Sequence, residues 1–178
     1  AGGTTQADHS LMLYQGGKTK VDVSTPWSTK EFEAVSLSEM PGAGSYVKPV
    51  TIAYDARLSA AYRTPFEATL GWAATDQAWL VVSVENYQFR SSDALRKLEM
   101  NWAGSWSATA GGSAVETVDT GYTDRVVFKI PKDATDFQIT YQPKGTYKYS
   151  YVAEGPKVVH KEKDVAAPDA ATVDIKFS

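Results

Sequence analysis

The chain has 178 residues, enough for one domain, and its 22% charged and 43% hydrophobic residues exclude a disordered or collagen-like protein. Eighteen Lys and Arg against 21 Asp and Glu give a net charge of -3, which argues against electrostatic binding of nucleic acid. The longest apolar run, residues 78–82, is too short to cross a bilayer, so we predict no transmembrane segment.

In chain order, the first 44 residues carry only short elements. Residues 10–14 form an apolar run that predicts a strand, and residues 21–25 alternate as a second one. Residues 30–37 fit either a helical turn or an edge strand, and a Pro- and Gly-rich loop follows at 40–44. We therefore predict that residues 1–44 are an N-terminal extension packed on the main domain.

The middle of the chain alternates between apolar and polar residues. Residues 46–58 predict a strand in which Pro49 marks either an edge strand or a strand start, and residues 66–72 predict another strand. Residues 78–87 are apolar on both faces, which predicts a central strand covered on both sides. Residues 91–98 resemble a single capped helical turn.

The last part of the chain predicts strands in quick succession, separated by turns such as Ala110–Ser113. These strands cover residues 98–102, 125–130, 137–141, 147–151, 158–159 and 173–177. In total we predict about nine or ten short strands with turns roughly every 8–12 residues. This spacing is typical of an all-β protein, an immunoglobulin-like antiparallel β-sandwich with short helical turns, in one domain over residues 1–178.

Composition supports the same fold class. The chain holds 17 Val and 17 Thr but only 8 Leu, together with 10 Tyr, 6 Phe and 5 Trp. Side chains branched at Cβ and aromatic side chains favour strands over helices. Cysteine is absent, so the chain has neither disulfides nor thiolate metal sites.

The first residues, AGGTTQ, are small and polar and do not begin with Met. This pattern predicts a secreted protein or one on the outer face of the cell envelope, with a processed N-terminus or a linker behind a lipid anchor. An artificial chain start is the alternative.

Two segments resemble a known family. Residues 78–86 (AWLVVSVEN) and residues 120–141 resemble the corresponding strands of small exported bacterial β-sandwiches with a telokin-like, immunoglobulin-like fold. The resemblance covers residues 50–141 and implies a secreted or lipid-anchored bacterial protein, in a family where many members have no assigned biochemical role. The chain departs from the family pattern because it continues for 37 residues after Tyr141.

A second resemblance concerns a tyrosine-rich strand. Tyr147-Lys148-Tyr149-Ser150-Tyr151 contains the Tyr-x-x-x-Tyr motif and resembles the haem-binding strand of near-iron-transporter domains. The resemblance implies haem as cofactor, with Tyr147 ligating the iron and Tyr151 hydrogen-bonded to Tyr147. On an extended strand the two side chains would be about 13 Å apart, so both reach one iron only through a turn or stacked rings.

Aromatic residues are the candidate ligand-binding residues. Tyr147, Tyr149 and Tyr151 share one face of a strand, and Trp102 and Trp106 lie near a loop or strand end. Exposed, these rings would stack on sugars, haem or a protein partner. Buried, they would fill one face of the sandwich, which is the alternative we favour for the tyrosines.

Little in the sequence supports catalysis. The two histidines, His9 and His160, lie in polar surroundings that predict solvated side chains, and Asp133 and Asp136 lie in a predicted turn. No nucleophile-elbow, phosphate-loop or zinc-protease motif is present. We therefore predict no enzyme, no catalytic residue and no metal.

The predicted function is a non-catalytic binding or structural module that recognises a protein or a cell-envelope component through an aromatic and polar patch. The first alternative is capture of haem or another small ligand through Tyr147 and Tyr151. The second is a carbohydrate-binding module that uses the same aromatic residues. The sequence leaves the partner and the oligomeric state open.

Overall fold

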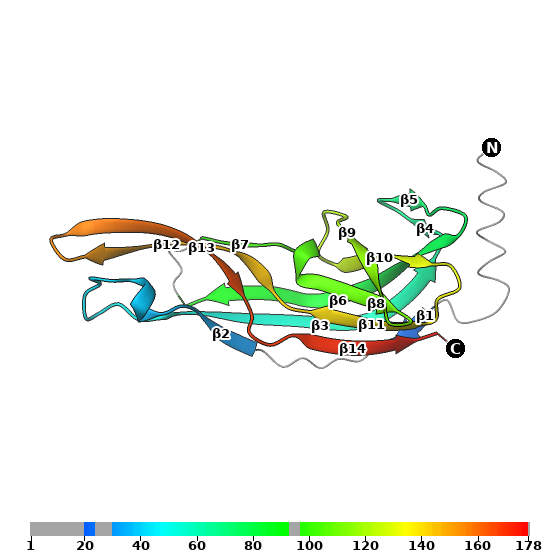
Figure 1. Cartoon of the computed structure of the whole chain (residues 1–178), viewed down its shortest axis with the longest axis horizontal. Helices are drawn as coiled ribbons and strands as arrows, with labels where there is room; N and C mark the ends of the chain where they lie inside the picture. The colour runs from blue at the N-terminus through cyan, green and yellow to red at the C-terminus, as the bar shows by residue number, and fades with distance from the viewer. Residues whose placement is uncertain (1–19, 24–29, 93–96, 178) are drawn as a thin grey trace.

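The computed structural model describes residues 20–23, 30–92 and 97–177, with the backbone alone for residues 86–88. The described residues form fourteen strands and two short 3-10 helices, and the paired strands run antiparallel. The predicted all-β antiparallel sandwich is therefore confirmed, while its immunoglobulin-like strand connectivity stays a prediction. Figure 1 shows an elongated molecule, with a broad sandwich at one end and a narrow hairpin at the other.

Most strands belong to one continuous path of pairing, β1-β3-β6-β10-β9-β8-β11-β14, with β2 also paired to β3. The strands of the first layer are β1 (Lys20–Asp22), β2 (Lys30–Val35), β3 (Val50–Thr64), β6 (Gln77–Ser91) and β10 (Arg125–Pro131). The strands of the second layer are β8 (Trp106–Ala110), β11 (Asp136–Tyr141) and β14 (Ala171–Lys176). Strand β9 (Ser113–Val118) joins the layers, because its first half pairs with β8 and its second half with β10.

The main core lies between these layers. Alternate side chains of β3, such as Ile52 and Leu58, are buried, and so are Ile139 and Tyr141 of β11. At the centre, the Tyr141 ring stacks on Trp106 with ring centroids 4.2 Å apart. The predicted alternation of these strands is thus confirmed, because period-2 patterns place one apolar face toward the core.

Strand β6 is covered on both faces, as predicted. Leu80 and Val82 point into the main core, whereas Trp79 lies on the opposite face in a second, smaller cluster with Ala73 and Val127. A short hairpin made of β4 (Phe66–Glu67) and β5 (Gly71–Trp72) adjoins this second cluster. The Trp79 Nε1–H donates a 2.9 Å hydrogen bond to the Gly71 carbonyl, which holds the hairpin against β6.

Several elements differ from the sequence-based expectation. Residues 30–35 form strand β2, the strand alternative for this segment, and the 3-10 helix η1 (Leu37–Glu39) follows it. Strand β3 begins directly after Pro49 but runs to Thr64, because two register shifts let one long strand bend along the sheet. The predicted strand at 10–14 and residues 93–96 of the predicted helical turn at 91–98 lie outside the described residues, whereas Ser91 ends β6 and residues 97 and 98 begin strand β7 (Lys97–Met100) in place of a helical turn. Strands β8 and β9 have no predicted counterpart, and the predicted single strand at 66–72 is instead the β4–β5 hairpin, so the described strands outnumber the predicted nine or ten.

The narrow end of the molecule is a three-stranded sheet of β7 (Lys97–Met100), β12 (Lys144–Ala153) and β13 (Lys157–Ala166). Its inner face carries the three tyrosines of β12, which are buried. The Tyr149 hydroxyl donates a hydrogen bond to the Glu39 carbonyl, and the Lys163 ammonium pairs with the Glu39 carboxylate. The loop that contains η1 is thereby held under the hairpin.

Strands β7 and β12 approach each other closely at Gly145. A Cβ atom on Gly145 would meet the Glu99 carbonyl oxygen and lie 2.9 Å from the Met100 Cα. We expect Gly145→Ala to lower the free energy of unfolding by about 1–3 kcal/mol through this overpacking, measured by urea denaturation. Gly44→Ala is the control, because a Cβ there meets nothing within 4 Å. Equal effects of the two substitutions would contradict the close approach.

The Glu39–Lys163 ion pair makes the attachment of the η1 loop sensitive to acid. The hydrogen bond from Lys163 lowers the pKa of Glu39, so this carboxylate stabilises the folded loop above its ordinary pKa. The contribution is lost as the pH falls through the lowered pKa. We expect the amide protection factors of residues 36–48, corrected for the intrinsic pH dependence of exchange, to fall as this happens. Glu39→Gln should remove this pH dependence, and an unchanged dependence would contradict the assignment.

Candidate functional site

The predicted ligand-binding residues are largely buried. Tyr147 is fully buried, Tyr149 and Tyr151 are 5% exposed, and Trp106 is 3% exposed. Trp102 is half-buried and contacts Trp106 across the 3-10 helix η2 (Ala103–Ser105), with ring centroids 5.4 Å apart. The structure therefore matches the expectation that the tyrosines fill one face of the fold. The three tyrosine rings do not form an exposed stacking surface.

The tyrosine strand also has internal partners. The Tyr147 hydroxyl lies 2.9 Å from the Ser91 hydroxyl, and the Tyr147 ring stacks on Tyr149 with centroids 6.2 Å apart. Haem capture through Tyr147 and Tyr151 stays a prediction, and it would require these side chains to leave their present packing.

We expect haemin to give no saturable Soret shift with the purified protein, because Tyr147 has no exposed surface. The measurement is an absorbance titration, with Tyr147→Phe as the control that keeps the ring and removes the ligating oxygen. A shift that saturates at one equivalent in the wild type and is absent in Tyr147→Phe would contradict this expectation and make haem capture the leading function.

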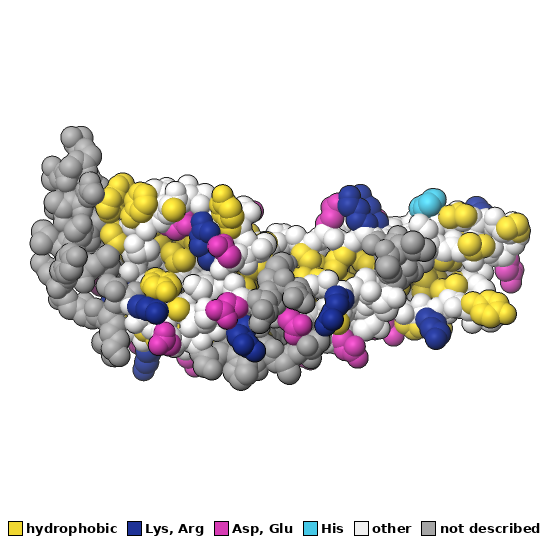
Figure 2. Space-filling view, turned by 180° about the vertical axis from the view of Figure 1, so that it is seen from behind, with side chains coloured by type: hydrophobic (Ala, Val, Ile, Leu, Met, Phe, Trp, Pro, Cys, Tyr) yellow, Lys and Arg dark blue, Asp and Glu magenta, His cyan; other side chains and the backbone are white. Residues whose placement is uncertain are grey.

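Exposed hydrophobic side chains define a different candidate site. The described residues include eight large exposed ones: Leu37, Tyr46, Tyr62, Phe66, Trp72, Tyr122, Val152 and Val158. Figure 2 shows hydrophobic side chains on the surface near both ends of the long axis. Three aromatic residues lie at the sandwich end, and these we call the aromatic end: Phe66, Trp72 and Tyr122, which are 45%, 40% and 56% exposed.

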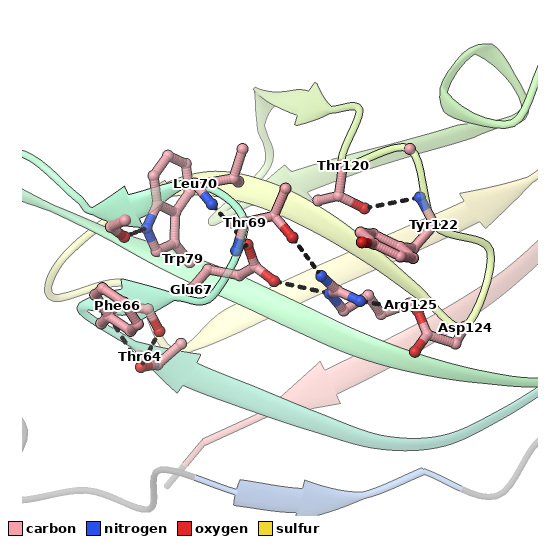
Figure 3. A network of polar contacts seen from close by, with 12 residues as sticks. Thr64, Phe66, Glu67, Thr69, Leu70, Trp79, Thr120, Tyr122, Asp124 and Arg125 are labelled. Carbon is pink, nitrogen blue, oxygen red and sulfur yellow. Dashed lines mark hydrogen bonds and ion pairs between the residues drawn. The ribbon is translucent and has the colours of Figure 1, made fainter.

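The aromatic end is built on the β4–β5 hairpin and the loop before β10. Phe66 and Trp72 are cross-strand partners, and their rings are in contact at a centroid distance of 5.0 Å with a 57° tilt. The Arg125 guanidinium lies 4.8 Å from the centroid of the Tyr122 ring, a cation–π contact. Figure 3 shows how Glu67 and Arg125 connect the hairpin to this loop.

Glu67 organises the hairpin. Its carboxylate is 5% exposed and accepts hydrogen bonds from the backbone N–H groups of Thr69 (2.7 Å) and Leu70 (2.9 Å). The other carboxylate oxygen accepts a 2.8 Å hydrogen bond from the Arg125 Nε–H. Because the buried charge is matched by three donors, Glu67 fixes the turn and joins it to β10.

Arg125 is the second centre of the network. Besides Glu67, it donates to the Asp124 carboxylate at 2.9 Å and to the Thr69 hydroxyl at 2.7 Å. These contacts bind the guanidinium to both the hairpin and the loop and hold it under the Tyr122 ring (Figure 3). The arrangement joins the hairpin to the loop and leaves the three aromatic rings exposed.

The surroundings of Tyr122 are acidic. Asp119 and Asp124 are exposed on the loop that carries Tyr122, and Asp119 accepts a hydrogen bond from the Gly121 N–H. Arg125 balances Glu67 and Asp124 only in part. The aromatic end therefore combines exposed rings with a slight excess of negative charge.

The residues considered for catalysis are scattered. His160 is exposed, and its Nδ1 lies 2.9 Å from the Ser150 hydroxyl, while Asp136 pairs with Lys176. His9 lies outside the described residues. Within the described ranges, no group of three or more His, Cys, Asp or Glu is placed to hold a metal ion, and no helix is long and apolar enough to span a membrane.

Comparisons with known proteins found no relative of this chain. No family model matches the sequence, and neither a curated protein nor a solved structure is significantly similar.

Proposed function

We propose that the protein is a non-catalytic binding module, exposed on the bacterial cell surface or secreted, that recognises a protein partner through the aromatic end. The observation that carries the proposal is the exposure of Phe66, Trp72 and Tyr122 on a frame fixed by the buried Glu67–Arg125 ion pair. Export is supported by the resemblance of residues 78–86 and 120–141 to exported sandwiches.

The residue types favour a protein partner. Tyr, Trp and Arg dominate the binding energy of protein interfaces, because they bury large areas and retain a polar group. Here Tyr122 and Trp72 are exposed, and the guanidinium under Tyr122 is already positioned by Glu67. A surface organised before binding loses less conformational entropy when the partner docks.

The geometry favours a protein over a carbohydrate. The rings of Phe66 and Trp72 are tilted by 57°, so they do not form one flat surface for a sugar ring. A tilted pair suits an aliphatic side chain inserted between aromatic edges. The exposed Asp119 and Asp124 add a preference for a basic partner surface.

The test starts from a photo-crosslinking residue at position 74, an exposed Ala two residues after Trp72. Envelope proteins captured in cells are identified, purified and titrated against the wild type by calorimetry. Trp72→Ala and Tyr122→Ala should each weaken the affinity by about 10-fold or more. Tyr46→Ala, an exposed Tyr at the opposite end, is the matched control and should have no effect. Affinities that are unchanged by both aromatic-end substitutions would overturn the proposal.

A further inference from the structure

A second exposed apolar cluster lies at the far end of the β12–β13 hairpin. We call it the hairpin tip and define it by Tyr46, Val152 and Val158, which are 96%, 55% and 54% exposed. Figure 1 places this hairpin at the end of the molecule opposite the C-terminus and the β4–β5 hairpin. The proposed function does not use these residues.

The two valines form a paired apolar surface. Val152 and Val158 are direct cross-strand partners, next to the turn at residues 154–156. They lie on the face of the β12–β13 hairpin opposite Tyr149 and Tyr151, so they take no part in the buried face. Further from the tip, the same outer face is polar, with the pairs Ser150–His160 and Lys148–Glu162. Apolar character on this face is therefore confined to the tip.

Tyr46 lies on the loop that follows η1, and this loop is attached to the hairpin next to its turn. An isolated bridge pairs Ala43 with Ala153, and the Glu154 N–H donates a 3.1 Å hydrogen bond to the Gly42 carbonyl. The loop therefore ends next to the hairpin turn, with the Tyr46 ring projecting into solvent. Two separate segments thus present apolar side chains at one narrow end.

The charged residues around the tip are mostly basic. Glu39 and Glu162 are neutralised in ion pairs with lysines of the hairpin. Lys48 and Lys157 are exposed, and within the described residues neither forms an ion pair with a carboxylate, whereas the Lys161 ammonium donates a 3.4 Å hydrogen bond to the Glu39 carbonyl. Glu154 is the remaining acid, so the lysines outnumber it.

We propose that the hairpin tip inserts into the interfacial region of an anionic lipid bilayer. Tyrosine is enriched at the membrane interface, aliphatic side chains enter the acyl boundary, and lysines bind anionic headgroups. The strand pairing of β12 and β13 extends to Ala153 and Lys157, so the backbone around both valines is already hydrogen-bonded.

The shape of the tip favours a bilayer over a protein partner. A stable protein interface needs roughly 800 Å² on each side, which usually requires a broad surface. Figure 2 shows that the hairpin end is narrow in comparison with the sandwich end. A narrow end with a few apolar side chains and lysines is suited to a soft, anionic surface that closes around it.

Vesicle co-sedimentation tests the proposal. The protein should sediment with vesicles of phosphatidylcholine and phosphatidylglycerol in equal parts, and much less with phosphatidylcholine alone. Val152→Thr with Val158→Thr, which keeps side-chain shape and strand preference, should reduce the bound fraction several-fold, and so should Tyr46→Ser. Lys48→Gln with Lys157→Gln should abolish the dependence on phosphatidylglycerol. Tyr122→Ser is the control at the aromatic end and should leave binding unchanged.

Depth of insertion gives a second readout. Because the chain has no cysteine, Val158→Cys provides a unique site for a polarity-sensitive fluorophore. Its emission should shift to the blue with the anionic vesicles, whereas the same label at Tyr122→Cys should not respond. No sedimentation, or sedimentation that the tip variants leave intact, overturns the proposal. Loss of binding with no blue shift at position 158 would instead indicate headgroup contact without insertion and also overturns it.

Discussion

Replacing Glu67 with Ala is expected to lower the free energy of unfolding by about 3 kcal/mol. The substitution removes a carboxylate that is 5% exposed and leaves its three hydrogen-bond donors, two backbone N–H groups and the Arg125 guanidinium, without it. Donors that lose a charged acceptor in a buried position keep their desolvation cost. Urea denaturation followed by circular dichroism measures the change.

Asp124→Ala is the matched control for this prediction. Asp124 pairs with the same guanidinium at 2.9 Å, but its side chain is 72% exposed, so the loss should stay below about 1 kcal/mol. Glu67→Gln should fall between the two, because one amide oxygen replaces two carboxylate oxygens. If Asp124→Ala is as destabilising as Glu67→Ala, the burial of Glu67 is not the cause. Loss of the hairpin in Glu67→Ala should also weaken any partner bound at the aromatic end.

The fold class followed from local patterns. Alternation in segments such as residues 137–141 reports which face of a strand is buried, and burial of one face needs no knowledge of the partner strand. The same reasoning identified the apolar face of β6 that carries Trp79, although not the hairpin that adjoins it. Local patterns do not predict which strands pair. Strand β9, for example, pairs with β8 in its first half and with β10 in its second half.

The candidate site was much harder to predict. Glu67 and Arg125 are 58 residues apart, and they meet only because β6 pairs with β10 and the β4–β5 hairpin folds over that pair. Phe66 and Trp72 have the same aromatic character as Tyr147, yet they are exposed and Tyr147 is buried. The one local signal for the exposed rings was the length of the segment. A hairpin of residues 66–72 is too short to have a core of its own, so the outer face of the hairpin stays in solvent.

Tyr141→Ala should be the most destabilising single substitution considered, with a loss of about 4 kcal/mol. Tyr141 is 1% exposed, and the centroid of its ring lies 4.2 Å from that of Trp106 and 6.3 Å from that of Tyr54. Removing the ring therefore opens a cavity where the two layers meet. Thr140 lies on the other face of the same strand and is half-buried. Thr140→Ala should therefore lower the free energy of unfolding by less than about 1 kcal/mol. Tyr141→Phe keeps the ring and should retain most of the stability. If thermal or urea unfolding finds Tyr141→Phe as unstable as Tyr141→Ala, ring packing is not what joins the two layers.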